Sequence, residues 1–422
     1  MKQTPVWREP NFIPLWIGSS LSSLADSAYY IVLAWFVLRL THSDADLATT
    51  LLLASLPRLL FMLIGGVAVD RISPRLLMLA SLAIRAAILL GLAAWLAQSH
   101  VSLHVTALYV VATLFGVVDA FYWPTQSALV PHALPPGTLP VANSFIQTAQ
   151  QLSMVLGPLL AGVILQLRHF SWIFSIVAGL YAISVAAISF IHIGPAELGE
   201  TVGRSNIWTE VGDGVRYVLG IRILLFLMLA SMLINLFFMG PVNIGLPSLV
   251  QDRGWSGTIY GYLESAIGLG AVAGGGFTVL MKGMRGHFRW IALSAAGIGL
   301  GLSAASVVTH WEWGVVFMAA SGAAMSITNI PVITYVQTIV EKSKMGRVMS
   351  LLTLMSVGLT PVSYGLSALI LRTRLLSPQG LMMVGGLVIA FFCAALIFQP
   401  DFRHMESHPR WKQAELDSTG GV

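Results

Sequence analysis

The chain has 422 residues, of which 56 % are hydrophobic and only 10 % are charged, and its formal net charge is +5. Soluble domains carry about 25 % charged residues, so this composition excludes a soluble protein. The basic residues are scattered over short loops and form no single patch, which argues against a nucleic-acid partner. The single cysteine, Cys393, excludes an intrachain disulfide and a cysteine metal site. We expect no cofactor and no metal.

Apolar runs long enough to cross a bilayer recur along the chain, because a hydrocarbon core of about 30 Å requires a helix of about 20 residues. The first run is too long for a cleavable signal peptide and continues as a span. We predict an all-α integral membrane protein with twelve transmembrane helices, at residues 12–40, 46–69, 75–98, 103–131, 141–167, 170–193, 222–250, 256–281, 288–309, 312–340, 346–372 and 379–399.

An even number of spans places both termini on the same side of the membrane. Of the 23 Lys and Arg residues, sixteen fall on that side, five on the other, and two within spans. The positive-inside rule then predicts that both termini are cytoplasmic in a multi-pass protein of the cell membrane.

A change of composition after the sixth span predicts how the chain is divided. Charged residues concentrate there, and apolar residues at helical spacing predict an amphipathic helix on the inner membrane face. We predict an N-terminal half at 1–193, a cytoplasmic linker at 194–221, a C-terminal half at 222–399 and a cytoplasmic tail at 400–422.

The two halves also resemble each other in sequence. Trp123-Pro124 matches Ile330-Pro331 at an offset of 207 residues, and Gly157-Pro158 matches Thr360-Pro361 at an offset of 203. Repeated halves of this kind place a substrate site near the bilayer midplane, between the repeats. The sequence therefore predicts two pseudo-symmetric bundles of six helices.

The loop between the second and third spans reads Gly65-Gly66-Val67-Ala68-Val69-Asp70-Arg71-Ile72-Ser73-Pro74-Arg75. This pattern resembles the cytoplasmic loop signature of the major facilitator superfamily of transporters, with Ser73-Pro74 where that family usually has Gly-Arg. The resemblance implies that Asp70 meets the start of the eleventh span when the cytoplasmic side is closed, where a helix N-terminus attracts an anion. The expected cytoplasmic gate comprises Gly66, Asp70, Arg71, Arg75 and Arg347.

A second motif narrows the resemblance to one branch of the family. Gly157-Pro158-Leu159-Leu160-Ala161-Gly162 in the fifth span is similar to the motif of the antiporter branch. The run from Pro124 to Pro131, followed by Ala142-Asn143-Ser144, is similar to bacterial exporters of the macrolide-efflux and enterobactin-exporter type. These resemblances imply a drug:proton antiporter. The fourth span, however, carries Asp119 and lacks the arginine motif of the family.

Four ionisable residues fall near the middle of first-half spans: Asp26, Arg58, Arg85 and Asp119. An unpaired charge at a helix centre costs about 2.5–3.5 kcal/mol, so we expect these residues to be paired, hydrated or neutralised. Two interpretations stay open. The four residues form structural salt bridges, or at least one of the two acids faces a central cavity and exchanges a proton, with the arginines as partners.

Glu264 is the only acid well inside the second half, and no basic residue shares its depth. It is either a proton carrier or cation contact, or a hydrated residue at the outer mouth. Polar and aromatic residues at cavity-facing positions suit an amphipathic ligand, although helix packing explains any single one equally well. The expected cavity residues are Tyr29, Tyr30, Trp123, Gln126, Asn143, Gln147, Gln151, Asn235, Phe238 and Asn329.

These observations favour a secondary active transporter that exports amphipathic small molecules, drug-like or siderophore-like, by alternating access with proton antiport. The expected partners are the substrate, protons and membrane lipid, and we expect a monomer. One alternative is a lysophospholipid flippase or facilitator of the same fold that needs no proton. A non-transporting membrane sensor or scaffold would need a soluble domain, for which only the linker and tail are available. We find no nucleotide loop, metal cluster or nucleophile–base set that would indicate an enzyme.

Overall fold

The computed structural model describes residues 5–69, 72–98, 104–167, 169–192, 212, 215–281, 288–341, 344–399 and 411, without the side chains of 62–69, 288, 350 and 357. Within these ranges the chain forms helices joined by short turns, and it contains no strand. Contacts divide the chain into two compact units. Unit 1 comprises Met1–Val202 and Val250–Ser265, and unit 2 comprises Gly203–Leu249 and Ala266–Val422.

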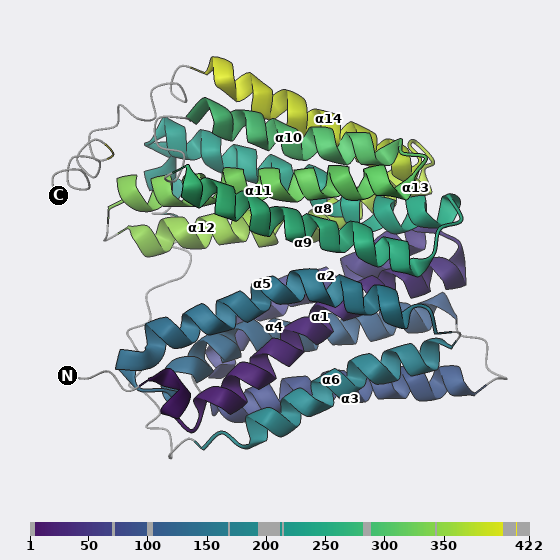
Figure 1. The fold of residues 1–422 in the computed structure, drawn as a ribbon, viewed down its shortest axis with the longest axis vertical. Helices are drawn as coiled ribbons and strands as arrows, with labels where there is room; N and C mark the ends of the chain where they lie inside the picture. The colour runs from purple at the N-terminus through teal and green to yellow at the C-terminus, as the bar shows by residue number, and fades with distance from the viewer. Residues whose placement is uncertain are drawn as a thin grey trace. The chain divides into compact units, whose positions relative to one another are not determined.

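Unit 1 contains the helices of the first six expected spans. They are α1 (Phe12–Thr41), α2 (Asp44–Val69), α3 (Pro74–Ala97), α4 (Val105–Ala133), α5 (Leu139–Ile164) and α6 (Phe170–Ser189), with the short helices η1 (Val6–Arg8) and η2 (Pro136–Thr138). Helix α1 packs against α5 and α6, α2 packs against α4, and α3 packs against α4 and α6 (Figure 1). This packing brings α1, α2, α3, α4 and α6 around a shared interior.

The remaining helices follow in the second part of the chain. They are α8 (Arg222–Asp252), α9 (Gly257–Leu280), α10 (Phe288–Ser306), α11 (Trp311–Ile339), α12 (Met345–Val357), α13 (Thr360–Arg372), α14 (Pro378–Ala395) and η4 (Leu396–Phe398). The end of α8 and the first nine residues of α9 group with unit 1, and the rest belongs to unit 2. In unit 2, α10 packs against α11 and α14 (Figure 1).

Each of the twelve expected spans therefore holds helical structure, and one of these spans is interrupted by a short turn. The segment expected as one helix at 346–372 is divided into α12 and α13. Pro361 lies in the first turn of α13, where it has no N–H to continue the α-helical hydrogen bonds from the preceding turn. Gly358 closes α12 by donating its N–H to the carbonyl of Leu354 at 2.8 Å.

The membrane-spanning character of these helices follows from their length and composition. In the described part of the chain, nine helical segments have the length and the mean hydropathy, 1.4 to 2.7 over 18 residues, to cross a bilayer. Helices α2, α5 and α10 occupy the other three expected spans. The chain is thus an all-helical multi-pass membrane protein.

The predicted linker and tail lie largely outside the described residues. Most of the expected amphipathic helix at 194–221 lies outside the described residues, among which 212 and 215–219 are helical. The division of the chain at 193 and 222 stays a prediction. From the tail at 400–422, Trp411 is described, and it is buried in unit 2. Its ring lies 5.2 Å from the ring of Tyr335, centroid to centroid. A cluster of buried side chains that includes Val218, Leu227 and Val336 surrounds the pair.

At the end of unit 1 that carries the N-terminus, Asn11 ties three helices together. Its side-chain amide donates to the carbonyl of Ala133 at 3.1 Å and to the carbonyl of His192 at 2.8 Å. The N–H of His192 donates back to Asn11 Oδ1 at 3.0 Å. One amide therefore holds the start of α1 against the ends of α4 and α6.

Candidate functional site

The four ionisable residues of the first-half spans come together inside unit 1. Asp26 lies on α1, Arg58 on α2, Arg85 on α3 and Asp119 on α4. The sequence separates them by up to 93 residues. They meet because α4 packs against both α2 and α3, while α1 contacts α2 and α4. We call these four residues the charge network.

Arg85 is the centre of the network. Its Nη1 donates to Asp26 Oδ1 at 2.8 Å, and its Nη2 donates to Asp119 Oδ1 at 2.5 Å. On the other side of Asp119, Arg58 Nε lies 3.0 Å from Oδ2. The hydroxyl of Tyr181, from α6, donates to Asp26 Oδ1 at 2.5 Å. Two acids and two bases thus form one connected and formally neutral chain of charges.

Aromatic rings enclose the central guanidinium. The Arg85 side chain is fully buried, and its Cζ lies 4.7 Å from the ring centre of Tyr122, 5.5 Å from that of Phe115 and 5.8 Å from that of Tyr181. Ring faces attract a cation, and the attraction is stronger where water is excluded. Tyr122 is in turn held by a hydrogen bond with Ser22 of α1.

The two acids of the network differ in their access to solvent. The side chain of Asp26 is 23 % exposed, whereas that of Asp119 is 3 % exposed. Asp119 contacts both arginines, while Asp26 shares only Arg85. Asp119 is therefore the more enclosed of the two carboxylates and the one with more cationic partners. In the described part of the chain, no group of three His, Cys, Asp or Glu side chains is arranged to hold a metal ion.

The two tyrosines that follow Asp26 differ in burial. Tyr29 is fully buried and stacks on Phe115 with ring centres 3.9 Å apart. Tyr30 is partly exposed and meets Tyr29 edge to face. The Tyr29 hydroxyl is buried and has no hydrogen-bond partner among the described residues. Tyr29 thus packs beside the charge network.

The polar residues predicted on the fourth and fifth spans are divided between buried and exposed positions. Gln126 is buried and accepts a hydrogen bond from Gln150 Nε2 at 3.2 Å, a partner that sequence reasoning missed. Trp123 is 45 % exposed. The predicted stripe on α5 is exposed along its whole length, and consists of Asn143, Gln147 and Gln151. Packing within the described residues therefore does not enclose these three amides.

Glu264 lies eight residues into α9, on the part of that helix that groups with unit 1. Tyr260, one turn earlier, donates a hydrogen bond to its carboxylate. The Oε1 atom is buried and has no hydrogen-bond partner in the part of the chain that the structure describes. Glu264 does not join the charge network, because no ion pair links it to either arginine.

The predicted cytoplasmic gate is described only in part. Gly66 falls in the last turn of α2, in the stretch without described side chains, and Asp70 and Arg71 lie outside the described residues. Arg75 is in the first turn of α3 and donates from Nη2 to the carbonyl of Ser189 at 2.6 Å. Arg347 is in the first turn of α12 and is partly buried. The expected contact between Asp70 and Arg347 stays a prediction.

The antiporter-like motif makes two close helix contacts. A Cβ at Gly157 would overlap the side chain of Ser27 on α1 and lie 3.2 Å from the backbone nitrogen of Ala28. A Cβ at Gly162 would lie 3.1 Å from the carbonyl oxygen of Thr258. Glycine allows backbones to approach in this way. Pro158, between them, is buried, so this motif acts as a packing element of unit 1.

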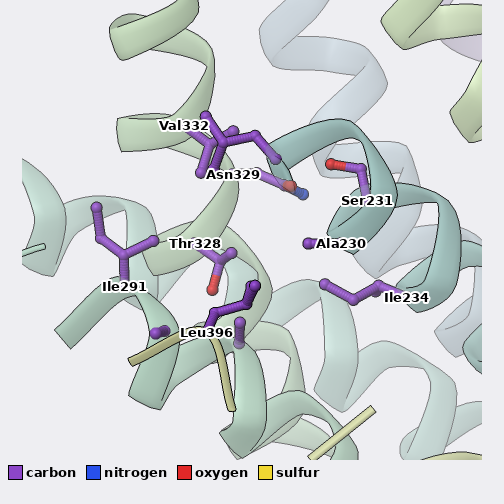
Figure 2. Close-up of a pocket in the computed structure, with 11 residues that line it drawn as sticks. Ala230, Ser231, Ile234, Ile291, Thr328, Asn329, Val332 and Leu396 are labelled. Atoms are coloured by element: carbon purple, nitrogen blue, oxygen red, sulfur yellow. The ribbon is translucent and has the colours of Figure 1, made fainter. Parts of the chain in front are cut away.

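The predicted cavity residues of the second half lie on α8 and α11. Asn235 donates to the carbonyl of Ser231 on its own helix at 2.9 Å, and Phe238 is buried. Asn329 is exposed and lines a cavity of about 30 Å³ between α8, α10, α11 and η4 (Figure 2). The expected role of Asn329 in a central substrate cavity stays a prediction, because this small cavity is lined by residues of unit 2 alone.

Comparison with known proteins places these features in a family. The protein-family model described as "Major Facilitator Superfamily" matches residues 15–363 of this chain. Macrolide efflux protein A of Streptococcus pyogenes is 24 % identical over 399 residues, which cover 92 % of this chain and 94 % of that protein. The multidrug efflux pump Tap of Mycolicibacterium fortuitum is 24 % identical over 263 residues, which cover 60 % of this chain and 63 % of the pump.

Solved structures of transporters share the fold. The nucleoside transporter NupG is similar with a TM-score of 0.68 and 16 % identity, covering 94 % of this chain and 98 % of that one. A D-xylose–proton symporter is similar with a TM-score of 0.62 and 14 % identity, covering 93 % of this chain and 98 % of that one. At this identity the likeness concerns the fold alone.

Proposed function

We propose that this chain, which belongs to the Major Facilitator Superfamily and is a transporter, exports amphipathic small molecules by proton antiport and alternating access. The efflux proteins among its relatives support the direction of transport. The exposed amide stripe on α5 supports an amphipathic substrate. We further propose that the transporter is a monomer in the cell membrane with cytoplasmic termini.

The observation that carries the proton coupling is the asymmetry of the charge network. With both acids ionised, the network has no net charge. When Asp26 takes up a proton, the network gains one positive charge, and Arg85 keeps Asp119 as its remaining carboxylate partner. Protonation of the more buried Asp119 would instead remove the negative charge that Arg58 contacts. This asymmetry supports Asp26 as the residue at which protonation changes the charge of the network.

Protonation of Asp26 would also weaken the hydrogen bonds that link α1 to α3 and α6. The Asp26 carboxylate holds α1 to α3 through Arg85 and to α6 through Tyr181. A protonated Asp26 accepts more weakly, because hydrogen bonds to an ionised group are about twice as strong as neutral ones. Proton uptake thus loosens α1 from α3 and α6, and proton release tightens it. We propose that alternation between these states accompanies the transport cycle.

The test uses proteoliposomes that contain the purified transporter and a pH-sensitive dye. A macrolide such as erythromycin is the first compound, chosen because of the named activity of one relative, and a panel of amphipathic compounds follows. We expect substrate-dependent proton movement in the natural protein and at least a tenfold loss in Asp26→Asn. Glu312→Gln, an exposed acid at the start of α11, serves as the matched control and should transport normally.

Two outcomes would overturn the proposal. If Asp26→Asn, Asp119→Asn and Glu264→Gln all retain substrate-dependent proton movement, the charge network and Glu264 do not couple transport to protons. If transport proceeds without dependence on an imposed pH gradient, the protein is a facilitator or a lysophospholipid flippase.

A further inference from the structure

The cavity lies within unit 2, near the ends of the helices that border it. Its wall includes Leu227, five residues after the start of α8, and Ile291, three residues after the start of α10. Val332 lines it seven residues before the end of α11. At 1.5 Å per residue, the cavity is about 5–10 Å from these helix ends. The predicted topology makes this the cytoplasmic side.

The walls of the cavity are apolar, and small residues leave the space open. Leu227 and Ile291 are buried, and so are Ala230, Ala292 and Ala295. A volume of about 30 Å³ exceeds the 10–15 Å³ that one water-sized group requires, so the cavity holds a group of about two or three heavy atoms. An apolar group of this size gains from burial against such walls.

Two polar groups at the cavity are available to a ligand. Thr328 already shares a hydrogen bond of 3.0 Å with Ser294. The Asn329 amide and the Ser231 hydroxyl have no side-chain hydrogen-bond partner in the described part of the chain. Figure 2 shows both polar groups directed toward the space between α8 and α11. Apolar walls with a few convergent polar groups are typical of small-molecule sites.

We propose that this cavity is a substrate subsite that receives a short branched apolar group adjacent to a carboxamide, carbonyl or hydroxyl. The apolar branch fills the space left by Ala230, Ala292 and Ala295, and Asn329 and Ser231 bind the polar group. This inference rests on the proposed export function, because it assigns the place where an amphipathic compound is first held on the cytoplasmic side. The subsite would recognise a branched apolar group, whereas the exposed amides of α5 offer only polar contacts.

Saturation-transfer NMR on the purified, detergent-solubilised protein tests the subsite without transport. The probe is isobutyramide, which joins an isopropyl group to a carboxamide, and acetamide is the control compound without the branch. We expect saturation of the isopropyl methyl groups and a several-fold weaker signal from acetamide. Asn329→Leu should weaken isobutyramide binding about two- to tenfold, the effect of one lost hydrogen bond. Ala295→Leu should abolish binding by filling the cavity.

Matched variants at exposed positions of α11 control for nonspecific effects. Gln337→Leu removes an exposed amide from α11, and Ala320→Leu adds the same volume at an exposed position, so both should bind isobutyramide normally. Ala295→Val replaces Ala295→Leu if the larger residue reduces the yield of folded protein. Equal signals from isobutyramide and acetamide, or unchanged binding in Asn329→Leu and the Ala295 variants, would overturn the subsite. Binding that persists in a protein without export would refute the function and retain the subsite.

Discussion

Replacing Asp119 by asparagine tests the charge network most directly. The two side chains have nearly the same shape, so the substitution removes a charge without opening a cavity. Asp119 is 3 % exposed and is the carboxylate that Arg58 contacts. After the substitution, Asp26 is the single remaining acid for two arginines. The network then carries one uncompensated positive charge inside the membrane-spanning helices.

The size of the effect follows from the burial of the pair. Breaking a buried ion pair by removing one partner costs about 3–5 kcal/mol, which is a large fraction of the about 5–15 kcal/mol that stabilises a typical protein. For 422 residues, an unfolding entropy of about 2.1 cal/mol/K per residue sums to about 0.9 kcal/mol/K. The expected decrease in Tm is therefore about 3–6 °C.

The assay is thermal unfolding of the purified protein in detergent, with a second variant that restores neutrality. Asp119→Asn combined with Arg58→Met leaves one acid and one base, Asp26 and Arg85. Because a charge-balanced replacement of a buried pair is often nearly neutral, we expect the double variant to recover most of the lost stability. Glu312→Gln, an exposed acid, should leave the Tm unchanged.

A simple sum of the two single effects would refute this reasoning. If the double variant unfolds at the temperature predicted by adding the shifts of Asp119→Asn and Arg58→Met, the residues do not interact energetically. An Asp119→Asn protein as stable as the natural one would show that the network is hydrated or neutral in the folded state.

Three further variants test other features. Gly157→Val should lower stability by about 1–3 kcal/mol, because its side chain overlaps that of Ser27; Gly91→Val, with no neighbour within 4 Å of a Cβ, controls for helix propensity in the same melting assay. Asn11→Ala should cost about 1–3 kcal/mol through its three lost hydrogen bonds, and unchanged unfolding would show that α1 is held at that end by packing alone. Asp70→Asn should reduce transport while expression stays largely intact, and normal transport would argue against the cytoplasmic gate.

The sequence predicted the members of the charge network but only part of its surroundings. Charges at the centres of apolar helices must be compensated, so Asp26, Arg58, Arg85 and Asp119 could be expected to pair without knowledge of the packing. Tyr181 could not be assigned in this way. Its contact with Asp26 depends on α6 packing against α1, which hydrophobic periodicity does not specify. A tyrosine in the middle of an apolar helix is the signal that could have indicated it.

The same distinction applies to the fold. Long apolar runs predicted where helices occur, since the bilayer thickness sets their length. The apolar run at 346–372 does not reveal the interruption between α12 and α13, although Thr360-Pro361 matches Gly157-Pro158 in the sequence. Pro158 lies inside the continuous helix α5, whereas Pro361 begins a new helix. The prolines at the two matching positions thus lie in different helical contexts.

The position of Trp411 has a practical consequence for handling this protein. Its ring packs beside Tyr335 at the end of α11 and belongs to the buried apolar cluster of unit 2. Removing the chain beyond η4 would delete Trp411 and expose the apolar cluster around Tyr335 to water, which would favour aggregation. A tag or fluorescent fusion on the C-terminal side should therefore leave Trp411 in place.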